Sequence, residues 1–318
     1  MMSDIQRPVL SFAAGYHLRA KPLCDGRVKM ANFELKAVAF EEDGKGHEEF
    51  LAGKYDTGEF SLANYLALKS RGEPFMAIPV FPNRKFRQSY IFVREDSPFK
   101  EPAQLKGKRV GIPGWLNTAG LWARGILSDD YGVKAQDIHW IARRKTQLDV
   151  SVPASTQLDV APGEGSLAAR LLKGEFDAII VPDFPDEDGV RRLFPDSKAV
   201  EQDFYRRTGI FPTSHAITFH KTYLDKHPSA AHEMFNACYE AKQLALRDDA
   251  DATYSNFAWN RQVWEEQRAV MGPDPWKYGI KGNEKVLNTI IRYAGEQGLL
   301  KNKVTIEDLF VPINEPQS

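Results

Sequence analysis

Short apolar runs alternate along the chain with stretches whose apolar positions recur at helical spacing, and this alternation predicts strands and helices in turn. The clearest example is residues 109–127, which begin with a short apolar run and turn at Pro113-Gly114. Asn117-Thr118 then stands at the N-cap of a predicted helix. The free N–H groups and the dipole at a helix start favour an anion, so this turn is a candidate site for a carboxylate.

The same alternation predicts the other elements. Strands are expected at residues 9–14, 33–40, 55–60, 75–81, 90–94, 138–142, 177–181 and 214–219. Helices are expected at residues 47–52, 61–68, 102–105, 166–172, 228–247, 263–271 and 284–297, with a short one near residue 306. Polar connectors are expected at residues 83–89 and 203–211, and a surface loop with some strand at 145–165.

A repeated six-residue segment organises these elements. Leu51 to Asp56 and Leu172 to Asp177 both run from a helix end through Gly, a charged residue and an aromatic residue to Asp, just before a strand. The Gly suits a helix C-cap with positive φ. We therefore expect two similar α/β lobes, each with a mostly parallel sheet, whose strand ends face a shared cleft.

The length of the chain fits this division, because 318 residues are more than one small core usually serves. Lobe one is expected to comprise residues 1–87 and, after the chain returns, residues 214–318, which end in a helical extension. Lobe two is expected to comprise residues 88–213. The crossings between the lobes would be residues 83–89 outward and residues 211–215 back.

Composition narrows the classes of partner. The chain has 42 Lys and Arg against 43 Asp and Glu, and neither half is markedly basic or acidic, which argues against nucleic acid. No segment approaches the roughly 18 apolar residues of a membrane span, and the apolar run near the N-terminus is too short for a secretory signal. A cytoplasmic protein without nucleic-acid or membrane partners is expected, while a homo-oligomer stays open.

The candidate chemistry lies at the predicted strand ends, since no nucleotide, metal or hydrolase motif is present. His17 and His215 are the two histidines expected at the cleft, where an imidazole could exchange a proton near neutral pH. The other cleft candidates could bind a carboxylate or an aromatic ring: Arg19, Ser61, Arg84, Arg87, Trp115, Asn117, Thr118 and Asp183. Surface positions are expected for His47, His220, His227 and His232.

Several segments carry a resemblance to a known family. The more specific ones are Thr208 to Pro212, which is followed by His215, and the helical stretch Trp122 to Leu127. The run Leu105 to Gly111 is common to binding proteins in general. On these residues the chain resembles, over nearly its whole length, the 4,5-dihydroxyphthalate decarboxylase family, which shares the fold of type 2 periplasmic binding proteins.

The resemblance implies a two-lobed α/β fold of that type, with a ligand cleft between the lobes and a helical C-terminal extension. It also implies a carboxy-lyase that protonates a ring carbon of a hydroxylated aromatic (di)carboxylate, such as 4,5-dihydroxyphthalate, and releases CO2. The ring hydroxyl supplies electron density, so no cofactor is strictly required. A divalent metal held by His17, His215 and Asp183 stays open, although no ligand motif supports it.

For this reaction, the predicted positions of the candidate residues at the cleft suggest a role for each. His215 is the first choice for the acid that protonates the ring, and His17 is the second. Either Arg84 or Arg87, together with Ser61 and the N–H groups at Asn117-Thr118, would hold carboxylate or phenol oxygens. Trp115 could stack on the substrate ring or, equally, pack between the lobes.

Two alternatives remain in view. A non-catalytic binding or sensor protein for a small aromatic or carboxylate anion has the same fold, and fold does not fix function. The absence of an export signal and of a lipid-anchor Cys argues against it. An enzyme such as a pyrimidine-precursor synthase of thiamine formation also shares the fold, but the chain lacks the His- and Cys-rich cluster that such oxidative chemistry would need.

Overall fold

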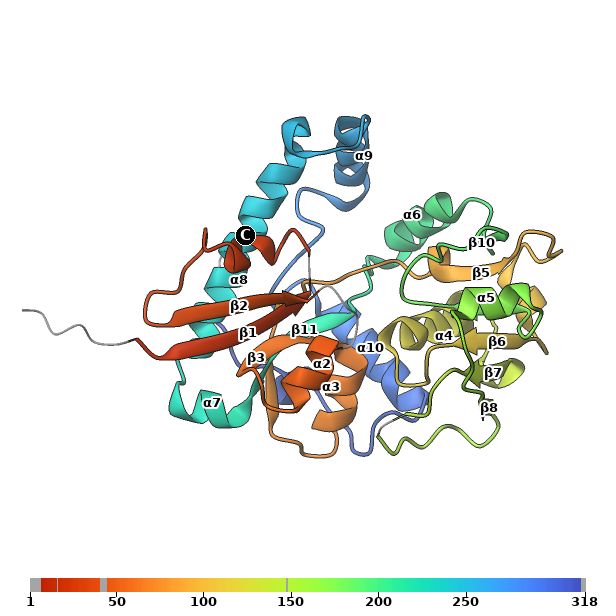
Figure 1. The fold of residues 1–318 in the computed structure, drawn as a ribbon, viewed down its shortest axis with the longest axis horizontal. Helices are drawn as coiled ribbons and strands as arrows, with labels where there is room; N and C mark the ends of the chain where they lie inside the picture. The colour runs from red at the N-terminus through yellow and green to blue at the C-terminus, as the bar shows by residue number, and fades with distance from the viewer. Residues whose placement is uncertain (1–6, 16, 41–44, 147, 316–318) are drawn as a thin grey trace, which may run out of the picture.

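Two mixed β-sheets form the two lobes of the molecule (Figure 1). The computed structural model describes residues 7–15, 17–40, 45–146 and 148–315. The first sheet has the order β2-β1-β3-β11-β4, in which β1 is parallel to β2 and β3, and β11 is antiparallel to β3 and β4. Its strands are β1 (Val9–Gly15), β2 (Glu34–Phe40), β3 (Thr57–Ser61), β4 (Phe75–Ile78) and β11 (His215–His220).

The second sheet has the order β10-β5-β9-β6-β7-β8. Its four strands from β9 to β8 are parallel, whereas β5 is antiparallel to both β9 and β10. The strands are β5 (Ile91–Arg94), β6 (Arg109–Ile112), β7 (His139–Ala142), β8 (Gln157–Val160), β9 (Ala178–Ile180) and β10 (Val190–Arg192). Each sheet thus keeps the expected parallel core. The antiparallel strands β5 and β11 are the ones that the chain enters directly after crossing between the sheets.

The helices cover the sheets and extend from them (Figure 1). They are α1 (Lys21–Cys24), α2 (Lys45–Leu51), α3 (Leu62–Lys69), α4 (Thr118–Tyr131), α5 (Leu167–Leu172), α6 (Ser197–Thr208), α7 (Lys221–Lys226), α8 (Ala230–Ala250), α9 (Asn260–Met271), α10 (Glu284–Glu296) and α11 (Ile306–Leu309). Within the described ranges, no helix combines the length and the apolar character that crossing a membrane requires.

The six-residue repeat has the same structure in both lobes. Gly53 follows α2 with φ 77° and Gly174 follows α5 with φ 78°, so each ends its helix in the left-handed region. The Asp of each copy then accepts a backbone N–H from the parallel neighbouring strand: Asp56 from Ser11 and Asp177 from Arg109, both at 2.9 Å. The repeat therefore marks equivalent strand entries in two similar lobes, as expected.

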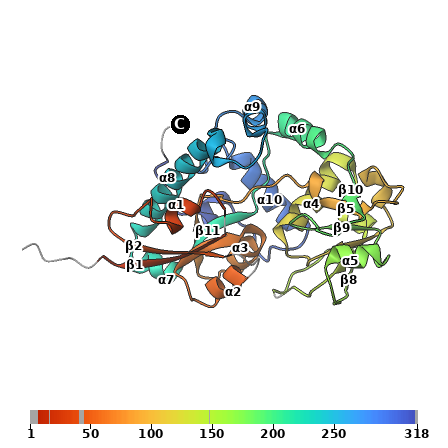
Figure 2. The same cartoon turned by 45° about the horizontal axis from the view of Figure 1, so that its top comes forward.

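The lobes share a continuous hydrophobic core. Helix α10 packs against both α3 and α4 near the middle of the molecule (Figure 2). The indole of Trp122 on α4 lies edge-on to Tyr293 of α10 and donates a hydrogen bond to the carbonyl of Thr213 in the returning crossing (2.8 Å). A second bridge joins α9 to α6, where Glu266 accepts hydrogen bonds from Lys198 (2.5 Å) and Gln202 (2.8 Å).

The close approach of α4 and α10 depends on Gly125. A Cβ at this position would lie 2.2 Å from the ring of Tyr293. We expect Gly125→Ala to lower the free energy of unfolding by about 1–3 kcal/mol, because the ring must shift within a packed core.

Gly295→Ala is the matched control, since its Cβ would meet its nearest neighbour, Leu300, only at 4.0 Å. It should leave stability unchanged or raise it by up to about 1 kcal/mol. Urea unfolding followed by circular dichroism measures both changes, and equal effects would contradict the packing argument.

The expected element list is wrong at residues 203–211 and omits the short elements α1, α7 and β10. Residues 203–211 are not simply a polar connector, because residues 197–208 form α6. This helix buries only Phe204, so its sequence lacks the apolar stripe that reveals a helix. Its ends are nevertheless well capped, by the Asp196 side chain and by Gly209 with φ 69°. Strand β10 was not predicted, since it has only three residues and two of them are arginines.

Candidate functional site

A buried carboxylate, that of Glu59, lies on β3 near the ends of three strands of the first sheet. All five residues of this strand are buried, and the Glu59 side chain is only 3% exposed. One of its oxygens accepts the backbone N–H of Gly15 at the end of β1 (2.9 Å). Ile217 of β11 pairs with it from the other side. Glu59 is not among the residues predicted from the sequence, although a carboxylate inside a predicted strand is a signal that points to it.

His17 and His215 both bind this carboxylate. The Nε2 atom of His17 lies 2.8 Å from one oxygen of Glu59, and the Nδ1 atom of His215 lies 2.6 Å from the other. The two predicted cleft histidines, 198 positions apart in the chain, thus share one partner. We call Glu59, His17 and His215 the Glu59 cluster; the catalytic roles of the two histidines remain predictions.

The charge of Glu59 follows from its surroundings. Burial alone would raise its pKa, but the two imidazoles oppose this by charge and hydrogen bonding, and the pKa lies well below its ordinary value. Glu59 is therefore ionised at neutral pH and can only accept hydrogen bonds. A positive charge on either neighbouring ring would be compensated within the cluster.

The hydrogen bonds distinguish the two histidines. In His17, Nδ1 accepts the backbone N–H of Ala20 (3.2 Å) while Nε2 faces Glu59, so both ring nitrogens are used. In His215 only Nδ1 is used, and it must carry a proton to donate to an ionised carboxylate. The Nε2 atom of His215 has no hydrogen-bond partner among the described residues. It is the ring atom of the cluster that is free to exchange a proton with a ligand.

His47 corrects an expectation of the sequence analysis, which placed it on the surface. It is half-buried on α2, with its ring edge-on to that of His215 (centroids 5.0 Å apart) and to Phe60 (5.4 Å). Burial is the main cause that lowers the pKa of His47 to about 4. The nearby His215 lowers this pKa further, and Glu59 opposes both effects. A neutral third imidazole therefore lies beside the cluster.

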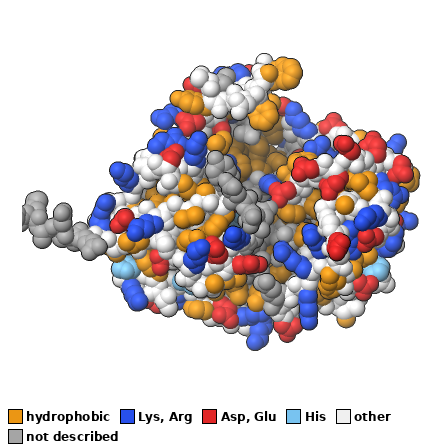
Figure 3. All heavy atoms as spheres, viewed as in Figure 1, with side chains coloured by type: hydrophobic (Ala, Val, Ile, Leu, Met, Phe, Trp, Pro, Cys, Tyr) orange, Lys and Arg blue, Asp and Glu red, His pale blue; other side chains and the backbone are white. Residues whose placement is uncertain are grey.

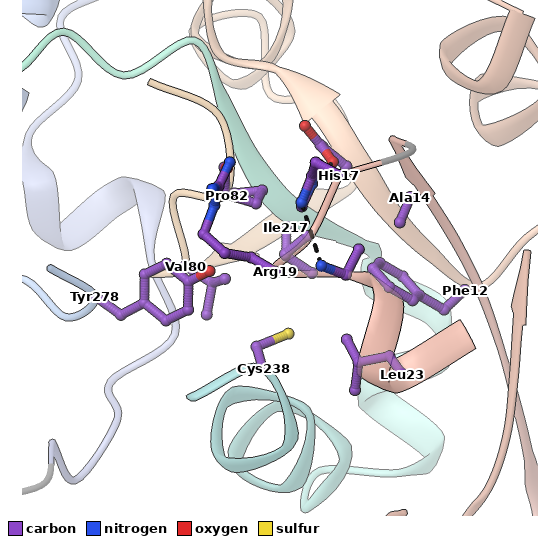
Figure 4. A pocket seen from close by; sticks show the side chains of 12 residues that line it. Phe12, Ala14, His17, Arg19, Leu23, Val80, Pro82, Ile217, Cys238 and Tyr278 are labelled. Carbon is purple, nitrogen blue, oxygen red and sulfur yellow. Dashed lines mark hydrogen bonds and ion pairs between the residues drawn. The ribbon is translucent and has the colours of Figure 1, made fainter. Parts of the chain in front are cut away.

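A narrow pocket lies beside the Glu59 cluster (Figure 4). The polar groups Glu59, His17, Arg19 and Tyr278 interrupt its largely apolar wall. The guanidinium of Arg19 lies 3.5 Å from the ring centroid of Trp276, and its Nε–H donates to the carbonyl of Pro82 (2.9 Å). Its other N–H groups have no partner among the described residues, so Arg19 can still bind an anion.

Ser61 and Thr118 join the starts of α3 and α4. Their hydroxyl groups are 3.0 Å apart, and the Thr118 hydroxyl also accepts the backbone N–H of Ala63 (3.1 Å). Asn117 caps α4 by accepting the N–H of Gly120 (3.0 Å). The Ser61 and Thr118 hydroxyls thus bind each other across the lobes, so a ligand could reach them only if the lobes moved apart, whereas Asn117 is used within its own helix.

The remaining cleft candidates are Arg84 and Arg87 in the outward crossing and Asp183 after β9. Arg84 is buried and donates to the carbonyls of Phe211 and Lys277 (both 2.9 Å) and to Asn283 (2.6 Å), so it mainly braces the crossings. Arg87 is also buried and donates to Ser214, but its Nε and one terminal nitrogen have no partner in the part of the chain that the structure describes. Desolvation lowers the pKa of each to about 10. Asp183 forms an ion pair with Lys85.

The expected stacking of Trp115 on a ligand is not what the structure shows. The ring is 1% exposed, its Nε1–H donates to the carbonyl of Gln297 (3.0 Å), and the guanidinium of Arg124 lies 3.9 Å from its centroid. Trp115 is a core residue, because the turn before α4 packs beneath α10 rather than facing an open cleft. Among the described residues, no group of three or more His, Cys, Asp or Glu side chains is placed to hold a metal ion.

Comparison with known proteins adds to this geometry. The chain is 31% identical to a 4,5-dihydroxyphthalate decarboxylase of Comamonas testosteroni over 98% of each chain. Residues 41–185 match the family model of periplasmic phosphonate-binding proteins of ABC transporters. The fold is similar to that of the periplasmic aliphatic sulphonate binding protein SsuA of Escherichia coli, with a TM-score of 0.56 and 16% identity. The match covers 98% of this chain and 94% of SsuA. The fold is also similar to that of the desulfurization enzyme DSZB (TM-score 0.55, 16% identity, 96% and 97% of the chains).

Proposed function

The chain belongs to the 4,5-dihydroxyphthalate decarboxylase family, and on that premise we propose that it removes CO2 from a hydroxylated aromatic carboxylate such as 4,5-dihydroxyphthalate, using the Glu59 cluster as its acid. The observation that carries this proposal is the buried, ionised carboxylate of Glu59 between two imidazoles, one of which has a free ring nitrogen. A binding protein has no evident need for such a proton-exchanging group.

The reaction proceeds in two stages at the ring carbon that bears the leaving carboxylate. Protonated His215 donates its Nε2 proton to this carbon, while the electron density comes from a ring hydroxyl. The carbon–carboxylate bond then breaks, its electron pair restores the aromatic ring, and CO2 leaves. Glu59 stabilises the positive charge on His215 before the transfer, and His17 keeps the Glu59 carboxylate oriented by its hydrogen bond.

Substrate anchoring falls to the guanidinium groups that retain free N–H donors. Arg19 lines the pocket beside Glu59, and its unpaired donors suit a carboxylate. Arg87 also has unpaired donors, next to Ser214 and therefore one residue from His215. The molecule is hollowed between the α8–α9 arm and the second lobe (Figure 3). Because Ser61 and Thr118 are in contact, an aromatic acid needs the lobes to separate before it enters, and closure then excludes water.

The proposal is tested by incubating the purified protein with a panel of hydroxyphthalates and hydroxybenzoates, with and without a chelator, and by measuring released CO2. We expect turnover of 4,5-dihydroxyphthalate to 3,4-dihydroxybenzoate. Tight binding of these acids with no CO2 release would favour the carrier or sensor interpretation. Loss of turnover with chelator would show that a metal takes part and would contradict a mechanism that relies on the Glu59 cluster alone.

A further inference from the structure

His47 is a third imidazole in contact with the Glu59 cluster. Helix α2 holds its imidazole beside His215 with an interplanar angle of 88° and against Phe60 with an angle of 80°. Neither ring nitrogen has a hydrogen-bond partner in the part of the chain that the structure describes. The titratable groups that act on it are His215 and Glu59. Unlike His17 and His215, it makes no hydrogen bond to the carboxylate.

The proposed reaction needs a second proton transfer. Protonating a ring carbon puts positive charge on the ring, and this charge is cancelled if the hydroxyl para to that carbon loses its proton. The imidazoles of His215 and His47 are in direct contact, with their centroids 5.0 Å apart, so no aromatic ring fits between them. A substrate ring that lies across both imidazoles could meet His215 at the carbon and His47 at the para oxygen.

Resting on the proposed function, we propose that His47 is a further catalytic residue, the base that accepts the proton of the ring hydroxyl para to the leaving carboxylate. A ring nitrogen of His47 takes the hydroxyl proton, and the oxygen electron pair moves into the ring. The ring carbon takes the proton of His215 as the C–H bond forms, and the carboxylate leaves as CO2. The product hydroxyl regains a proton from His47, so the net change is one proton consumed for each CO2 released.

The electrostatics fit this division of roles. Burial and the neighbouring His215 keep His47 neutral at physiological pH, so it is able to accept a proton. His215 instead faces an ionised carboxylate that compensates a positive charge. Adjacent groups whose surroundings favour different protonation states are the usual arrangement for an acid and a base in one site.

The test compares His47→Gln with the wild type and with His232→Gln, a control that changes an exposed histidine on α8. With 4,5-dihydroxyphthalate, we expect kcat to fall about 100-fold or more in His47→Gln and to stay unchanged in His232→Gln. The affinity for phthalate, which has no hydroxyl, should stay within about twofold of the wild type in both. If His47→Gln does not fold, His47→Met fills the same space and also lacks the base.

A pH series distinguishes a base from a structural residue. The ratio of wild-type to His47→Gln kcat should shrink as the pH rises from 7 to 9, because a growing fraction of the substrate hydroxyl is then already ionised. A ratio that stays constant with pH, or one near unity, would overturn the role of His47. If the wild type itself releases no CO2, the proposed function fails instead.

Discussion

His215→Gln should reduce CO2 release from 4,5-dihydroxyphthalate by about 100- to 10,000-fold, because the substitution removes the proton that the ring carbon receives. A glutamine amide can still donate a hydrogen bond to Glu59, so the cluster keeps its geometry. Binding of phthalate, measured by titration calorimetry, should change by less than about threefold. The effect would therefore appear in kcat and not in affinity.

His17→Gln is the matched comparison for this prediction. Both ring nitrogens of His17 are already hydrogen-bonded, to Glu59 and to Ala20, so this residue positions the carboxylate rather than supplying a proton. We expect a loss of kcat of about tenfold, well short of the range for a lost general acid. A larger loss in His17→Gln than in His215→Gln would reverse the assignment, and full activity of His215→Gln would refute it.

Glu59→Gln should also lower turnover by about 100-fold or more. The neutral amide cannot compensate a positive charge on His215, and one end of it presents N–H groups to an imidazole nitrogen that must itself donate. The control is Glu34→Gln on β2, where the carboxylate is half-exposed and lies 3.7 Å from Lys36. That variant should keep wild-type kcat.

Glu59→Gln also changes how the free energy of unfolding depends on pH. The pKa of Glu59 is lower in the folded chain than in the unfolded chain, so its contribution is present above about pH 4.5 and is lost as the pH falls below this value. The urea midpoint of Glu59→Gln should therefore fall less than that of the wild type between pH 5 and pH 3. Parallel midpoints would mean that Glu59 is not held ionised in the folded protein.

The sequence was informative about the fold because its signals were local. The Gly and Asp of the six-residue repeat fix a helix end and a strand entry in each lobe, and both copies have the same backbone geometry. Helix α6 was missed because its stabilising features are two caps and its surface is polar. The mixed character of the sheets was missed because strand direction depends on where the chain crosses between lobes.

The site was only partly predictable for a related reason. His17 and His215 could be placed at strand ends from the sequence, but nothing local says that both meet Glu59. The position of His47 depends on how α2 lies against β11, and the burial of Trp115 depends on α10, whose residues lie more than 160 positions further along the chain. Such long-range packing decides whether a polar or aromatic side chain faces a ligand or the core.

The most direct measurement is the decarboxylation of 4,5-dihydroxyphthalate by the purified wild-type protein in D2O, followed by proton NMR and CO2 detection. Ring protonation by a solvent-exchanging imidazole predicts one CO2 for each 3,4-dihydroxybenzoate formed, with a single deuterium at the carbon that carried the lost carboxylate. Product without deuterium at that carbon, or binding of the substrate without CO2 release, would contradict the account.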